Sequence, residues 1–132
     1  MEVVVDTSVL IAVLTSESER AVLVERTRGT NLIAPASVHW EVGNAFAAML
    51  KRRRITLPEI EQALDSYKKI PVRLLAVDLT TALHLAAEHN LYAYDAYVIA
   101  CARRQQCPLL TLDAGLARAA RAAGVQRMEI NE

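Results

Sequence analysis

Short apolar runs alternate along the chain with longer stretches in which apolar residues recur every three or four positions. The run from Val3 to Val5 consists of β-branched residues with no polar face, which predicts a strand buried on both sides. The stretch after Ser37 shows the second pattern, which predicts a long helix with one buried stripe. The expected strands are 2–6, 31–34, 72–77, 109–111 and 125–130. Because strands and helices alternate, we predict an α/β fold, a parallel sheet of about five strands flanked by helices on both faces.

Capping and breaking residues set the expected ends of the helices. Ser16 and Ser18 are candidate N-caps for the second helix, and Ser37 is the candidate for the long one. Thr56 begins a capping-box pattern. The expected helices cover 8–14, 19–28, 38–50, 56–70, 79–89, 96–105 and 114–123.

Length and composition bound the class of protein. The chain of 132 residues fits one domain, 1–132, and 53% hydrophobic residues suffice for one core. The 15 acidic and 15 basic residues cancel, which argues against a nucleic-acid binder that acts through global positive charge. Cys101 and Cys107 have no companion ligands and are interpreted as buried thiols in a reduced cytosol. The first apolar run is short and has no basic leader, so we expect a cytoplasmic protein with no signal peptide and no membrane span.

Four acids stand at the ends of the expected strands and helices. Asp6 closes the first strand and Asp113 follows the fourth, so their carboxylates converge if these strands are neighbours. Glu41 lies one turn inside the long helix, and Asp95 opens a later helix. Each acid alone is explained as a cap or as a solvated helix residue. Carboxylates that are brought together repel one another unless a cation lies between them, and Mg²⁺ or Mn²⁺ prefers such oxygen-only clusters.

The segments around these acids resemble the motifs of a known family. They read Val3-Val-Val-Asp6-Thr-Ser8, Glu41-Val-Gly-Asn44-Ala, Tyr94-Asp95-Ala-Tyr-Val-Ile-Ala-Cys-Ala102 and Leu110-Thr-Leu-Asp113. Each is short, but in this order and over nearly the whole chain they resemble the four motifs of PIN-domain ribonucleases. The layout is closest to the VapC toxins of bacterial and archaeal toxin–antitoxin pairs. Tyr92 departs from the pattern, since a smaller residue is more usual there, and this affects the expected shape of the cleft.

The resemblance implies a metal-dependent endoribonuclease that hydrolyses RNA phosphodiester bonds and is the toxin of a type II toxin–antitoxin pair. A bound metal ion would lower the pKa of a water molecule and make it a nucleophile. The residues implied to be catalytic, and to hold Mg²⁺ or Mn²⁺ directly or through water, are Asp6, Glu41, Asp95 and Asp113. Those implied to support the metal or the substrate are Ser8, Asn44 and Thr111. The family further implies a cognate antitoxin, with a basic side chain placed among the acids, and a homodimer.

RNA phosphates require cations, and several basic residues are candidates. They are Lys51, Arg52, Arg53, Arg54, Arg103, Arg104 and Arg118. For the run 51–54 a solvated helix end that interacts with the helix dipole is an equally good interpretation. Tyr92 and Tyr94 flank Asp95 and are candidates for stacking on a base, or for half-buried packing. The histidines show no metal-ligand spacing, and surface or core-edge roles are expected for them.

Two other classes of function share parts of this pattern. A catalytically silent PIN-fold binding module, acting in a protein or RNA complex, would keep the fold, but the intact set of acids argues against it. A receiver-type phosphoacceptor also has acids at strand ends, yet it needs a lysine after its last strand, and no lysine follows Lys69. A shift of the melting temperature by Mg²⁺ or Mn²⁺ would discriminate a metal enzyme from a silent module.

Overall fold

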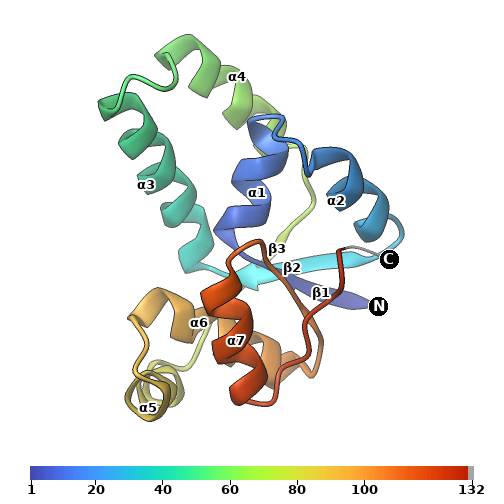
Figure 1. The fold of residues 1–132 in the computed structure, drawn as a ribbon, viewed down its shortest axis with the longest axis vertical. Helices are drawn as coiled ribbons and strands as arrows, with labels where there is room; N and C mark the ends of the chain where they lie inside the picture. The colour runs from blue at the N-terminus through green and yellow to red at the C-terminus, as the bar shows by residue number, and fades with distance from the viewer. Residues whose placement is uncertain (131–132) are drawn as a thin grey trace.

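The computed structural model describes residues 1–130 and is built around a four-stranded parallel sheet with the order β3-β2-β1-β4 (Figure 1). The strands are β1 (Glu2–Val5), β2 (Asn31–Pro35), β3 (Arg73–Leu75) and β4 (Leu109–Leu110). The helices are α1 (Thr7–Leu14), α2 (Arg20–Thr27), α3 (Ser37–Lys51), α4 (Leu57–Tyr67), α5 (Leu79–His89), α6 (Ala93–Gln105) and α7 (Ala114–Ala122). Strand β1 lies between β2 and β4, so residues that follow β1 are close to the ends of both neighbours.

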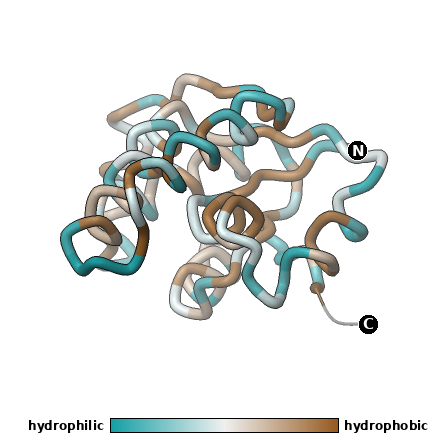
Figure 2. Tube along the Cα trace, turned by 90° about the horizontal axis from the view of Figure 1, so that it is seen from above, coloured by the Kyte–Doolittle hydropathy of each residue, from teal (hydrophilic) through white to brown (hydrophobic). Residues whose placement is uncertain are grey.

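Helices cover both faces of the sheet, which confirms the predicted α/β class. Figure 1 shows α1 to α4 on one side of the strands and α5 to α7 on the other. The valines of β1 point alternately to the two sides: Val4 belongs to the buried cluster with α5, α6 and α7, whereas Val3 and Val5 belong to the cluster with α1 to α4. In Figure 2 the hydrophobic residues follow the strands through the middle of the molecule and the hydrophilic ones lie on the outer turns. The uninterrupted valine run is therefore explained by burial on both faces.

The fifth expected strand, 125–130, is reduced to one bridge. Arg127 pairs in parallel with Leu109, and the backbone hydrogen bonds there join Leu109 to Gln126 and Met128. Strand β4 itself has only two residues, so there is little edge for a further strand to pair with. The segment after α7 covers the edge of β4 without forming a regular strand.

All seven predicted helices are present within residues 1–130, with corrections at some of their starts. Ser37 is the first residue of α3 and not its N-cap, which is Ala36, and neither Ser16 nor Ser18 caps α2, which follows Glu19. Helix α6 begins at Ala93, so Asp95 lies inside its first turn rather than before it. Thr56 and Glu59 form the expected capping box. Within residues 1–130, no helix is both long enough and apolar enough to cross a membrane.

Candidate active site

Asp6 lies at the end of β1 and is almost fully buried, with 6% of its surface exposed. One carboxylate oxygen, Oδ1, accepts hydrogen bonds from the Ser8 hydroxyl at 2.6 Å and from the Val9 N–H at 3.2 Å. The other, Oδ2, accepts a hydrogen bond from the Thr111 hydroxyl. The Val9 contact makes Asp6 the N-cap of α1. Capping uses one oxygen and one N–H, so the two additional hydroxyl donors fix the carboxylate more tightly than a cap requires.

Asp113 lies beside Asp6 because β1 and β4 are neighbours, as predicted. It is the exposed N-cap of α7, and its Oδ1 accepts the Leu116 N–H at 3.1 Å. The fully buried hydroxyl of Thr111 accepts the Asp113 N–H at 3.0 Å while it donates to Asp6. Ser8 completes the link between the strands by accepting the Leu112 N–H at 3.0 Å. Ser8 and Thr111 thus hold the two strand ends, and with them the two acids, in one fixed arrangement.

Glu41 projects from α3 and carries a buried carboxylate oxygen, Oε2, that makes no hydrogen bond within residues 1–130. Two hydroxyls near it, Thr7 Oγ1 and Ser37 Oγ, are likewise buried and without a partner in this part of the chain. Both hydroxyls are close enough to Glu41 to offset part of the rise in its pKa, but neither is in hydrogen-bonding geometry. Buried polar atoms are almost always paired, so three unpaired ones in one place indicate a ligand site.

The two hydroxyls beside Glu41 were missed by the sequence analysis. Ser37 precedes Glu41 by four residues, which places both on the same face of α3, and Thr7 directly follows Asp6. This spacing was a usable signal. An exposed Trp40, with 74% of its surface accessible, was also missed; its ring packs edge-on against His39.

The four acids are electrostatically coupled as a ring. Asp6 interacts with Asp113, Asp113 with Asp95, Asp95 with Glu41, and Glu41 with Asp6. Burial raises the pKa of Asp6, Glu41 and Asp95 above their ordinary values, and repulsion by the neighbouring acid raises it further. For Asp6, hydrogen bonds from Ser8, Thr111 and Val9 oppose this increase in pKa. The ring therefore resists carrying its full negative charge without a cation.

The donor set fits a hard divalent cation that retains water. All donors are carboxylate or hydroxyl oxygens, which Mg²⁺ and Mn²⁺ prefer. Within residues 1–130 no three acidic, histidine or cysteine side chains approach closely enough to bind one ion together. Mg²⁺ commonly takes one or two carboxylates and fills its remaining positions with water and substrate phosphate. The residues thus suit an ion with few direct protein ligands and not a closed protein cage.

The remaining predicted site residues lie outside this ring. Asn44 is exposed on α3, and Lys51 to Arg54 are exposed at the far end of that helix, about 15 Å along its axis from Glu41. Arg103 and Arg104 are at the opposite end of α6 from Asp95, about 12 to 14 Å away along the helix. The histidines lie outside the ring, and His39 contacts the Tyr67 hydroxyl at 3.1 Å. Cys101 is buried and unpaired, and burial raises the pKa of its thiol to about 11, consistent with an inert packing role.

The chain is similar to known proteins in both sequence and fold. A family model described as PIN domain matches residues 3–122. Ribonuclease VapC3 of Mycobacterium tuberculosis (strain ATCC 25618 / H37Rv) is 30% identical over 119 residues, which are 89% of this chain and 87% of that protein. The structure of PAE2754 from Pyrobaculum aerophilum superposes with a TM-score of 0.71 at 22% identity, covering 90% of this chain and 86% of that one.

A second similar structure is a complex. VapBC2 from Rickettsia felis, bound to a DNA fragment from its promoter, contains a chain that matches with a TM-score of 0.67 at 9% identity. The match covers 97% of this chain and 98% of the other. At these identities both structural matches indicate a shared fold.

Proposed function

This chain belongs to the PIN domain family, and on that basis we propose that it is a metal-dependent endoribonuclease, the toxin of a type II toxin–antitoxin pair. The observation that carries the proposal is the ring of four coupled acids beside the carboxyl ends of β1 and β4, in which one buried Glu41 oxygen has no partner within residues 1–130. The 30% identity to a ribonuclease of the VapC type supports RNA as the substrate.

The four acids of the ring would hold the ion in different ways. Asp6 is fixed by Ser8 and Thr111 and is the principal candidate for a direct ligand. Asp113 is exposed beside it and is free to bind through its second oxygen, since Oδ1 caps α7. Asp95 and Glu41 close the ring from the opposite helices and would act directly or through water. When bound, Mg²⁺ or Mn²⁺ supplies a water of lowered pKa and neutralises charge on the scissile phosphate.

A proton must leave the attacking water, and Glu41 is the best placed acceptor. Its pKa is raised, chiefly by burial, which makes it a stronger base than an exposed carboxylate. Asp95 is the second candidate because its pKa is raised for the same reason. The basic run 51–54 and the pair Arg103 and Arg104 are proposed to contact phosphates further along the RNA, given their distance from the acids.

We extend the proposal to partners. An antitoxin that silences this site would place an arginine among the four acids, because a guanidinium can replace a divalent cation between carboxylates. The VapBC2 complex, which contains a chain of this fold, supports the proposal that the chain assembles with a partner protein. A homodimer is the proposed assembly of the toxin. Its RNA substrate would be met in the cytoplasm.

The test is cleavage of RNA by the purified chain with Mg²⁺, Mn²⁺ or EDTA. We expect cleavage only with a divalent ion, and loss of cleavage in Glu41→Gln. Glu61→Gln is the matched control, because Glu61 is exposed on α4 and lies outside the ring. A wild-type chain that binds Mn²⁺ and RNA but cleaves no RNA would instead identify a silent binding module.

A further inference from the structure

Arg118 is an unpaired cation beside the acidic ring. It lies in α7, five residues after Asp113, and is exposed. Within residues 1–130 it makes no hydrogen bond and no ion pair. Its neighbour Arg127, in contrast, is occupied, since its guanidinium donates to the Thr111 carbonyl at 2.9 Å. Arg118 is therefore available to a ligand in a way that Arg127 is not.

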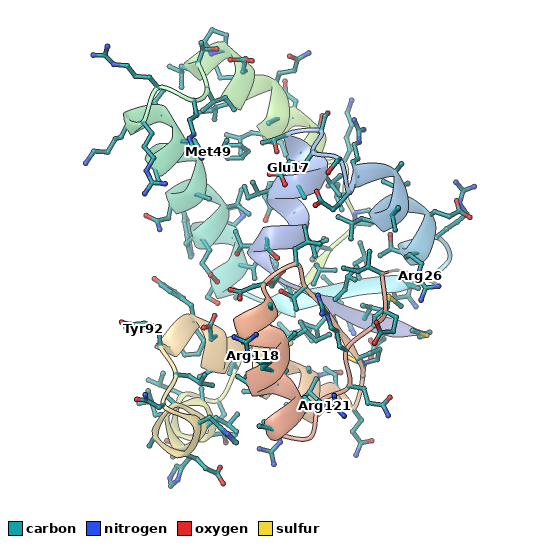
Figure 3. All side chains as sticks on the ribbon, in the orientation of Figure 1. Glu17, Arg26, Met49, Tyr92, Arg118 and Arg121 are labelled. Carbon is teal, nitrogen blue, oxygen red and sulfur yellow. The ribbon has the colours of Figure 1, made fainter. Side chains whose placement is uncertain are left out.

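Gly115 leaves space for the Arg118 side chain to reach the acids. A Cβ at position 115 would lie 3.3 Å from Asp113 Oδ1 and 3.8 Å from Arg118 Nη2, so both groups border the gap that Gly115 leaves. Side chains of a helix lean toward its N-terminus, which directs Arg118 back to the end of α7 that Asp113 caps. Figure 3 shows Arg118 about midway along α7 and Arg121 nearer its C-terminal end.

Gly115 is not explained by the stability of α7, because glycine in a helix is less stable than alanine by about 1 kcal/mol. Its position between the Asp113 carboxylate and the Arg118 guanidinium indicates a functional requirement.

We propose that Arg118 binds an RNA phosphate next to the scissile bond. This inference rests on the proposed function and adds a substrate-binding residue to it. A polyanion that approaches four acids needs positive charge in addition to the metal, and a guanidinium binds phosphate through two parallel hydrogen bonds. The other candidate cations lie about 12 Å or more along their helices from the nearest acid of the ring. Arg118 is the basic residue that shares a border with the ring's own carboxylate.

The experiment compares Arg118→Ala with Arg121→Ala, an exposed arginine on the same helix. A fluorescein-labelled single-stranded 20-nucleotide RNA is titrated in EDTA, where no cleavage occurs, and binding is followed by anisotropy. We expect Arg118→Ala to weaken binding about tenfold or more, the usual range for a charge-assisted hydrogen bond. The slope of log affinity against log salt should fall by about 0.7, the value for one phosphate contact. Arg121→Ala should stay within about twofold.

A second measurement separates this role from a structural one. Mn²⁺ binding to the protein without RNA, followed by electron paramagnetic resonance, should be unchanged or tighter in Arg118→Ala, because a nearby positive charge is removed. With Mn²⁺ and RNA, KM should rise while kcat is retained. Arg118→Lys should restore part of the affinity.

Three results would overturn the inference: wild-type RNA affinity in Arg118→Ala, an equal loss in Arg121→Ala, or loss of Mn²⁺ binding in Arg118→Ala. Failure of the proposed function is distinct, because the wild-type chain would then cleave no RNA with any divalent ion.

Discussion

The Thr111 hydroxyl donates to Asp6 Oδ2 and accepts the Asp113 N–H at 3.0 Å, so one buried side chain joins the acids of two adjacent strands. A hydroxyl is suited to this position because it is both donor and acceptor. The separation of the two acids is thereby set by the parallel register of β1 and β4 and not by flexible side chains. The arrangement is preorganised before any ion binds.

Replacing Thr111 with valine should lower the stability of the protein through loss of the hydroxyl group and not through a change in side-chain volume. Valine fills the same volume but leaves an Asp6 oxygen and the Asp113 N–H without a partner. We expect the free energy of unfolding to fall by about 1–3 kcal/mol, the usual range for an unsatisfied buried group. Urea denaturation measures this. Thr111→Ser should recover most of the loss, and Thr27→Val, on α2, provides a control for removing a less buried threonine hydroxyl.

Replacing Thr7 should affect the stability of the metal-free protein and the stabilisation by metal in opposite directions. In Thr7→Val the metal-free protein should be as stable as wild type or slightly more stable, because a buried polar atom without a partner is removed. The rise in melting temperature on adding Mn²⁺ should nevertheless be smaller, since the site loses one of its hydroxyl oxygens. Thermal melting with EDTA and with Mn²⁺ gives both values. Equal Mn²⁺ shifts in the two proteins would exclude a role for Thr7 at the site.

The raised pKa values predict how stability depends on pH. The pKa of Asp6 is raised from its ordinary value of 3.8, chiefly by burial. A carboxyl group of this kind favours folding while it is protonated, and the contribution is lost as pH rises through the raised pKa. In EDTA, the stability of wild type relative to Asp6→Asn should therefore fall as pH rises above about 4. Saturating Mn²⁺ should abolish or reverse the trend, because the ion binds the charged form. A pH-independent difference in EDTA would contradict the assignment.

Tyr92 offers a test of base stacking. It is 88% exposed at the N-cap of α6, three residues before Asp95, so its loss should not affect folding. We expect Tyr92→Ala to weaken binding of single-stranded RNA by about 1–3 kcal/mol, the usual value for one stacked base, and Tyr92→Phe to retain it. Wild-type RNA affinity in the alanine variant would exclude a role for Tyr92 in base stacking.

The architecture and the spatial grouping of the acids were predictable from sequence because both follow from backbone rules. An apolar run that ends on Asp6, and another followed by Asp113, predict adjacent buried strands with acids at one edge, and the structure confirms that they are neighbours. The segment 125–130 was predicted as a strand because strands and helices alternate along the chain and Gly124 closes the preceding helix. A strand forms only where it can pair with a neighbouring strand, however, and the two-residue β4 provides too short an edge for the segment to pair with.

The details of the site were less accessible to sequence reasoning. Ser37 was expected to cap α3, because serine is a favoured N-cap residue. The helix instead begins at Ser37, one residue earlier than expected, and the Ser37 hydroxyl lies near Glu41. The role of Gly115 depends on the space between two side chains that only the folded chain brings together. The roles of the four acids as metal ligands remain predictions.

The central claim, that Asp6 binds metal and does not merely cap α1, is tested most directly by pairing Asp6→Asn with Asp78→Asn. Both aspartates cap a helix, Asp6 through the Val9 N–H and Asp78 through the Thr81 N–H, and asparagine caps about as well as aspartate. Of these two aspartates, only Asp6 belongs to the ring of four acids. The measurement is cleavage of RNA with Mn²⁺, together with the Mn²⁺-induced shift of the melting temperature. We predict that Asp6→Asn remains folded but loses both, while Asp78→Asn keeps both. Wild-type cleavage and a wild-type shift in Asp6→Asn would contradict the account at its centre.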